Sequence, residues 1–153
     1  MNVLGVLTSG PTAFRGEGVN HENEPFMGTL SVQSLEGGRA ALLTYVATLK
    51  NGDVVHSEST LLGVGPDGNL CLWPVMSELP VVLPHTQTIA RSEPGVLALA
   101  VFGSGPRDDS TSFREEITIR VNSDGSLVYS HAWGLPEGAF EERSSCTMVP
   151  SVA

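Results

Sequence analysis

The stretch Leu43–Leu62, LTYVATLKNGDVVHSESTLL, consists of two alternating runs joined by Asn51-Gly52. This dipeptide is typical of a two-residue type I′ hairpin loop, because both central positions of that turn require a positive φ, which Asn and Gly adopt readily. Residues that are directly opposed across a hairpin share one face of the sheet. A two-residue loop here predicts the pairs Tyr45–Glu58, Ala47–His56 and Leu49–Val54.

Turn signals of the same kind lie on both sides of this hairpin. Gly37-Gly38 predicts a two-residue loop, and Pro66-Asp67-Gly68 predicts a three-residue loop that ends with Gly in the left-handed region. The registers set by the three separate turns agree on which face is apolar, which favours a four-stranded meander. The predicted inner face comprises Leu30, Val32, Leu43, Tyr45, Ala47, Leu49, Val54, His56, Glu58, Thr60, Leu62, Val64, Leu70 and Leu72.

The second half of the chain has a similar pattern around Ser123-Asp124-Gly125. A three-residue loop here gathers the apolar and aromatic residues of the following strand on the inner side. A two-residue loop at Asp124-Gly125 would turn Val128 inward instead, so we favour the longer loop. The resulting pairs are Val121–Leu127, Ile119–Tyr129, Ile117–His131 and Glu115–Trp133. Further strands are predicted near residues 81–90, 96–102 and 140–149.

One domain is expected for a chain of 153 residues. Short turns between sequential hairpins favour an all-β, single-domain antiparallel up-and-down β-barrel of about 8–10 strands over a sandwich, because Greek-key sandwiches need long crossovers. Residues 1–25 have little periodicity and are predicted to form an N-terminal arm, with a short strand over Asn2–Thr8. Residues 26–153 are assigned to the barrel.

The charge balance argues against several classes of partner. Seventeen acidic and eight basic residues give a net charge of −9, and Lys50 is the single lysine, so neither a nucleic-acid surface nor a basic membrane patch is expected. No apolar run approaches the ~18 residues of a membrane span, and the N-terminal segment lacks the pattern of a signal peptide. Cys71 and Cys146 fit no metal or redox spacing, so both are expected to be reduced thiols in a cytoplasmic protein.

Several polar and aromatic residues fall on the otherwise apolar inner face. Burying carboxylates without partners is unfavourable, so two inward acids indicate water, a ligand, or hydrogen bonds among the residues themselves. A cavity with apolar walls and a few convergent polar groups is the usual form of a small-molecule site. The predicted ligand-binding residues are Tyr45, His56, Glu58, Glu115, Tyr129, His131 and Trp133.

His56 and Glu58 are two residues apart on a predicted strand and therefore project to the same side. They have the chemistry of metal ligands, or of a base and the group that orients it; a satisfied pair at the mouth of a barrel is a third interpretation. A metal site would need another ligand such as His85 or His131, which no motif supplies, so we predict no metal. His21 and His85 stand alone in the sequence and are predicted to lie on loops or on the strand surface.

The segment Phe26-Met27-Gly28-Thr29-Leu30 resembles the start of the calycin barrels, in which a Gly followed two residues later by a large apolar residue opens the first strand. The later hairpins and the closing segment Phe140–Arg143 resemble small bacterial lipocalin-like and fatty-acid-binding-like proteins, with nitrobindin-type haem barrels in the same broad group. The resemblance implies a lumen that holds one hydrophobic or amphipathic molecule. The nitrobindin-type haem histidine lies near the C-terminal end, whereas no His follows His131 here, so haem is disfavoured and no cofactor is predicted.

We therefore predict that the protein binds a small hydrophobic or amphipathic molecule in the barrel lumen. An enzyme that uses lumen His and Glu residues for proton transfer is the first alternative, and it is less favoured because no spacing fixes catalytic roles. An interaction module whose barrel is filled by its own side chains is the second. Trp73 and Cys71 share the predicted outer face, where an exposed aromatic side chain would suit a homodimer contact.

Overall fold

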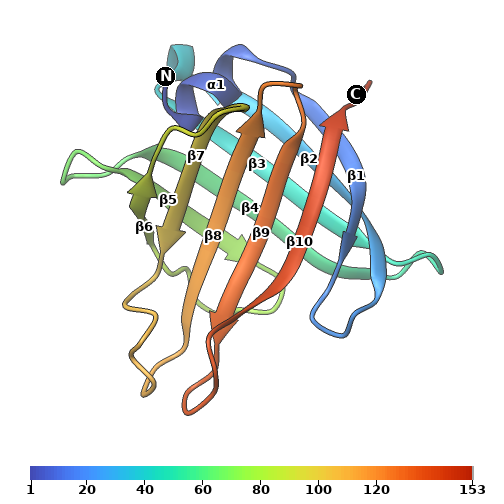
Figure 1. Cartoon of the computed structure of the whole chain (residues 1–153), viewed down its shortest axis with the longest axis vertical. Helices are drawn as coiled ribbons and strands as arrows, with labels where there is room; N and C mark the ends of the chain where they lie inside the picture. Colours follow the sequence, from blue (N-terminus) through green and yellow to red (C-terminus); the bar gives the residue numbers. More distant parts are fainter. Residues whose placement is uncertain (153) are drawn as a thin grey trace.

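The computed structural model describes residues 1–152, which form one closed barrel of ten antiparallel strands (Figure 1). Consecutive strands are neighbours, and β1 pairs with β10 to close the barrel. The predicted up-and-down barrel is therefore confirmed, and the sandwich alternative is wrong. The strands are β1 Ala13–Val19, β2 Pro25–Leu35, β3 Ala40–Thr48, β4 Val54–Val64, β5 Leu70–Met76, β6 His85–Ala90, β7 Val96–Gly103, β8 Arg114–Asn122, β9 Leu127–Gly134 and β10 Glu141–Pro150.

The N-terminal residues differ from the predicted arm. The short strand expected over Asn2–Thr8 is instead a helix, α1 (Val3–Ser9), whose N-terminus is capped by Asn2 accepting a hydrogen bond from the Gly5 backbone N–H at 2.9 Å. The helix buries Val3, Leu4 and Leu7, a spacing that places three apolar side chains on one helical face. It lies across one end of the barrel, where it contacts β2, β3, β7 and β8 (Figure 1).

β1 belongs to the barrel although its sequence has no alternating pattern. Glycines occupy two of its positions because neighbouring atoms leave no room for a side chain. A Cβ at Gly16 would overlap the carbonyl oxygen of Thr147, and one at Gly18 would overlap the ring of Phe26. Gly in a strand commonly marks such a close approach of another backbone. Because glycines stand where an alternating strand would have larger side chains, the sequence of β1 lacks the periodicity by which a strand is recognised.

The predicted registers are confirmed at the centre of each hairpin. Tyr45 lies opposite both Leu30 on β2 and Glu58 on β4, so one inner row runs across three strands. Leu62 lies opposite Leu72 on β5. On the other side of the barrel, β8 and β9 have the pairs Val121–Leu127, Ile119–Tyr129, Ile117–His131 and Glu115–Trp133.

The turn at Asn51-Gly52 differs from the predicted two-residue loop. Leu49 donates its N–H to the carbonyl oxygen of Asp53 at 2.9 Å, so the loop contains three residues. Thr48 then pairs with Val54, and a β-bulge restores the predicted pairing of Ala47 with His56. The extra residue is Val55.

This bulge corrects the predicted inner face. Val54 was expected to point inward opposite Leu49, but its side chain is 59% exposed. Val55 and His56, although adjacent in sequence, both line the interior, as happens where a bulge redirects a side chain. Val64, at the other end of β4, is also exposed rather than inward, because it lies at the rim beside the turn.

Two further features of the barrel bear on the site. The β5–β6 ladder is short and has the pairs Cys71–Thr86 and Leu72–His85. The largest buried side chains are mainly aliphatic and aromatic and pack with the inner face of α1; they include Leu30, Leu43, Leu62, Phe102, Ile119 and Leu127.

Within residues 1–152, no helix has the length and apolarity that crossing a membrane requires.

Candidate functional site

A cavity of about 280 Å³ lies in the barrel at the end remote from α1. Its walls are mostly apolar and are formed by Phe26, Ala47, Val55, Met76, Phe113 and Trp133. Polar groups reach it from several strands and from the loop after β5; they include Tyr45, His56, Glu78, Glu115, His131 and Arg143. Apolar walls with a few convergent polar groups are typical of small-molecule sites.

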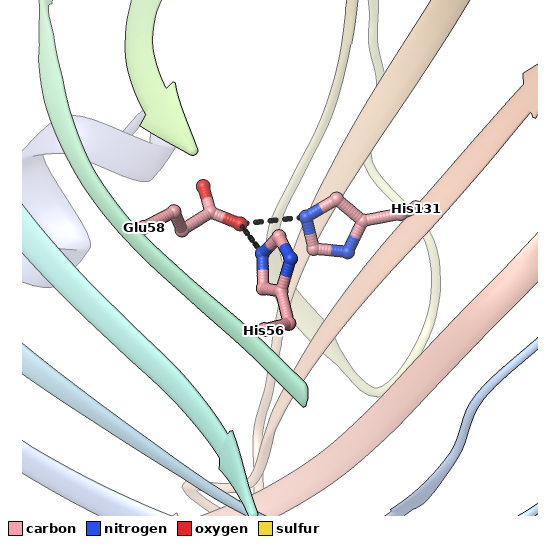
Figure 2. A group of neighbouring side chains, drawn as sticks. All are labelled: His56, Glu58 and His131. Atoms are coloured by element: carbon pink, nitrogen blue, oxygen red, sulfur yellow. Dashed lines mark hydrogen bonds and ion pairs between the residues drawn. The ribbon is translucent and has the colours of Figure 1, made fainter. Parts of the chain in front are cut away.

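Glu58 is the hub of the polar groups on one side of this cavity. Its Oε1 accepts hydrogen bonds from Nε2 of His56 at 2.9 Å and from Nε2 of His131 at 2.7 Å (Figure 2). Its Oε2 accepts two more, from the Thr60 hydroxyl at 2.8 Å and from the Tyr129 hydroxyl at 2.9 Å. The carboxylate is buried, and these four donors replace the water that it loses.

Strand geometry explains how these residues meet. His56, Glu58 and Thr60 alternate on β4 and so project to the same side, and Tyr129 and His131 do the same on β9. β4 and β9 are five strands apart in either direction around the ten-stranded barrel. The cluster therefore joins opposite walls across the lumen.

His56 lies between two carboxylates. Its Nε2 faces Glu58, while Nδ1 is 2.9 Å from both carboxylate oxygens of Glu78. Burial by itself lowers the pKa of His56, but the hydrogen bonds to Glu58 and Glu78 outweigh it and raise the pKa to about 10. Burial likewise works to raise the pKa of Glu58, but His131 and His56 outweigh it and hold that pKa well below its usual range. His56 is thus an imidazolium between two carboxylates.

The aromatic rings of this cluster pack against one another. The ring centroids of Tyr45 and Tyr129 are 4.7 Å apart, and the rings of His56 and His131 meet edge to face at 5.1 Å. The Tyr45 hydroxyl is buried and has no hydrogen-bond partner among the residues that the structure describes. Gly28 makes room for the Tyr45 ring and the thiol of Cys146, since a Cβ at Gly28 would lie 2.6 Å from Sγ.

Glu115 belongs to a second, separate cluster. Its Oε1 is 2.9 Å from Nε2 of His85, whose Nδ1 donates to the carbonyl oxygen of Leu83 at 2.6 Å. The prediction that His85 lies on a loop or surface is therefore wrong: its side chain is fully buried. His131, which the register places diagonal to Glu115, hydrogen-bonds to Glu58 instead.

Aromatic and charged side chains surround the mouth of the cavity. The Arg143 guanidinium lies over the Trp133 ring, 4.6 Å from its centroid, and His21 meets the same ring edge-on at 5.8 Å. Phe113, from the segment before β8, packs on Trp133 at 6.4 Å. Trp133 thus connects the β1–β2 loop with β9 and β10.

The structure brings most of the predicted site residues to the cavity. Tyr45, His56, Glu115, His131 and Trp133 line it. Glu58 and Tyr129 lie behind its surface, where Glu58 hydrogen-bonds to both histidines and Tyr129 donates to Glu58. Sequence reasoning missed Glu78 and Arg143, which line the cavity, and the buried position of His85, which contacts the cavity residue Glu115. Glu78 lies in a loop, and no turn fixes the register of His85 because residues 77–84 contain two prolines; neither carries a periodic signal.

The cluster has the donor atoms of a metal site and the groups of an acid–base pair. Nitrogen atoms of His56 and His131 and a carboxylate oxygen of Glu58 all lie within 4.8 Å of one another. Two imidazoles and one carboxylate are a common ligand set for first-row transition metals.

Comparison with known proteins shows the fold and no more. No protein-family model matches the chain, and no curated protein matches it in sequence. Thirteen chains of solved structures are similar to it. One is the crystal structure of Rv2717c from M. tuberculosis, with a TM-score of 0.72 and 13% sequence identity over 93% of this chain and 92% of that chain. The chain therefore shares its barrel architecture with a known structure.

Proposed function

We propose that the barrel binds one small amphipathic molecule in the cavity at the end remote from α1. The observation that carries this proposal is the cavity itself: about 280 Å³ of space with apolar walls and histidine and carboxylate groups on its inner surface. Pockets for drug-sized ligands measure about 300–1,000 Å³, so the ligand is a small one. An empty space of this size also argues against a barrel filled by its own side chains.

The charges on the cavity surface favour a ligand whose polar end donates hydrogen bonds. Glu78 and Glu115 present carboxylate oxygens from two sides, and the N–H groups of His56 are engaged by Glu58 and Glu78. An amine or hydroxyl group would find acceptors there, while Val55, Met76 and Phe113 would contact its apolar body. A carboxylate on the ligand would instead be repelled by the like charges of Glu78 and Glu115.

The resemblance to calycin barrels supports the same proposal, since lipocalin-like and fatty-acid-binding-like proteins hold apolar molecules in the lumen. Both cysteines are free and buried, which agrees with a cytoplasmic location. Proton transfer is the second candidate function, and the placement of His56 between Glu58 and Glu78 favours it. Turnover that disappears in a His56→Gln variant would distinguish catalysis from binding alone.

Neighbouring residues of the bulge provide a matched test. Val55 lines the cavity and Val54 is exposed, so Val55→Phe narrows the cavity while Val54→Phe adds the same ring outside. N-phenyl-1-naphthylamine, a neutral apolar amine that fluoresces in apolar surroundings, serves as the probe. We expect saturable binding by the wild type and by Val54→Phe, and at least tenfold weaker binding by Val55→Phe, about 1.4 kcal/mol.

Two results would count against the proposal: no saturable probe binding by the wild type, or equal binding by both variants. Native mass spectrometry of the protein purified from its own host would then identify the natural ligand, as a mass that Val54→Phe retains and Val55→Phe loses.

A further inference from the structure

We infer that His56, Glu58 and His131 bind a divalent first-row transition-metal ion, such as Zn²⁺, on the inner surface of the cavity. The inference goes beyond the proposed function, because it concerns an ion and needs no organic ligand. It rests on the convergence of three donor atoms: Nε2 of His56 and Nε2 of His131 are 2.9 and 2.7 Å from the same oxygen, Oε1 of Glu58 (Figure 2).

The spacing of these atoms suits an ion after a small adjustment. Ligand atoms about 2.0–2.2 Å from a tetrahedral ion are roughly 3.3–3.6 Å apart, so the two nitrogens need to move from Oε1 by less than about 1 Å, and all three donor atoms already lie within 4.8 Å of one another. In the ion-free protein the imidazole N–H protons link the three atoms. An ion replaces those protons, as ligand deprotonation on metal binding requires.

Outer contacts hold two of the ligands in the orientation that a metal needs. His56 binds the Glu78 carboxylate through Nδ1, which leaves Nε2 directed at the centre. Glu58 is held through Oε2 by Thr60 and Tyr129, which leaves Oε1 directed at the centre. Metal-binding histidines and carboxylates are typically supported in this way through the atom that does not ligate.

The position of the cluster in the barrel leaves an open side. His56 and His131 line the cavity while Glu58 lies behind them, so an ion among the three has protein on one side and the cavity on the other. Three protein ligands and an open position distinguish sites that bind water or a small molecule from closed structural sites. The ligand class that such an ion would accept is a small molecule with an oxygen or nitrogen donor.

The test uses the metal alone. Chelator-treated wild-type protein is dialysed and titrated with Co²⁺, followed by visible absorption, and with Zn²⁺, followed by calorimetry. We expect one equivalent of each ion to bind and Co²⁺ to give d–d bands of a site with imidazole ligands. Glu58→Gln and His131→Gln each change a ligand and should weaken Co²⁺ binding by more than about 100-fold. Glu78→Gln changes only a residue that hydrogen-bonds to a ligand, so it should weaken binding by about 10–100-fold.

Two histidines outside the cluster serve as controls. His85→Gln removes a buried lumen histidine and His21→Gln an exposed one, and both should bind Co²⁺ as the wild type does. Cu²⁺ added to wild-type protein gives a readout that needs no variant, since coupling to two imidazole nitrogens is visible by electron paramagnetic resonance. Absence of a stoichiometric site in the wild type, or unchanged Co²⁺ affinity in Glu58→Gln, would overturn the inference.

The outcome is independent of the proposed function. Probe binding in the presence of chelator together with no metal site would overturn the metal inference and leave the cavity proposal standing. A metal site in a protein that binds no probe would support the inference and count against the cavity proposal.

Discussion

The lumen contains two clusters of histidine and carboxylate that look alike in composition and differ in connectivity. At Glu58, one carboxylate accepts four hydrogen bonds and two histidine nitrogens converge on a single oxygen. At Glu115, one histidine bridges a carboxylate and the backbone carbonyl of Leu83. The first arrangement directs the nitrogens of two histidines at one carboxylate oxygen, whereas the second directs only one histidine nitrogen at its carboxylate. Convergence, rather than the mere presence of His and Glu, is what makes a candidate site.

The two clusters also join different parts of the barrel. The Glu58 cluster links β4 with β9 on opposite walls, and the His85–Glu115 contact links β6 with β8, two strands apart. Breaking a buried ion pair by removing one partner is strongly destabilising, because the other charge remains buried. Replacing Glu58 leaves four donors without an acceptor, whereas replacing Glu115 affects one histidine. We therefore expect a larger loss of stability from substitutions at Glu58.

The largest effect is expected for Glu58→Ala. The substitution leaves the hydroxyls of Thr60 and Tyr129 and one N–H each of His56 and His131 without their acceptor, at a cost of about 3–5 kcal/mol in the free energy of unfolding. Urea denaturation in the presence of chelator measures the loss. His21→Gln, which removes the exposed His21–Glu22 pair at 3.7 Å, is the control and should change stability by less than about 0.5 kcal/mol. A loss below about 1 kcal/mol for Glu58→Ala would show that the cluster is not a connected unit.

The second effect is a pH dependence that belongs to the Glu58 cluster. Folding raises the pKa of His56 from 6.5 to about 10, so its contribution to stability is fully present below pH 6.5 and is lost as the pH rises through about 10. One proton corresponds to a slope of at most about 1.4 kcal/mol per pH unit. Unfolding free energies measured across this range in chelator should fall for the wild type and fall less steeply for His56→Gln. Parallel curves would contradict the ion-pair assignment.

The smallest effect is expected for Glu115→Gln. Its amide oxygen still accepts a hydrogen bond from His85, so only the charge is lost, and the free energy of unfolding should fall by about 1–3 kcal/mol. Because Glu115 lines the cavity, binding of N-phenyl-1-naphthylamine should weaken while the stoichiometry of Co²⁺ stays at one. Loss of the Co²⁺ site in this variant would erase the distinction between the two clusters.

The central registers of the barrel could be predicted because turn residues specify them. Pro66-Asp67-Gly68 and Ser123-Asp124-Gly125 set loop lengths without reference to the rest of the chain, and Gly68 and Gly125 have the positive φ that such loops require. Asn51-Gly52 misled by one residue, since two-residue and three-residue loops both use Gly at this point. The bulge at Val55 compensated the error, so the predicted pair Tyr45–Glu58 was still found.

The parts of the site that could not be predicted depend on contacts between distant segments. Glu78 and Arg143 approach the cavity from a loop and from the start of β10, and nothing in the local sequence indicates where those segments lie. His131 could be placed on the inner face but not assigned to Glu58 rather than Glu115, because the choice depends on how the barrel closes. β1 was missed because its glycines are required by close contacts with atoms of β2 and β10, which the local sequence does not reveal.

The short β5–β6 ladder makes the barrel uneven in its resistance to opening. A strand of a closed barrel is normally secured by backbone hydrogen bonds along both of its edges, but β5 and β6 share the pairs Cys71–Thr86 and Leu72–His85. Separating these two strands breaks fewer bonds than separating any other neighbours, so transient openings concentrate at this seam and backbone amides of β6 exchange with solvent before those of β3 or β8. The contact of His85 with Glu115 ties β6 to β8 through a side chain and adds no bond to β5, so we expect β6 to stay with β7 and β8 when it separates from β5.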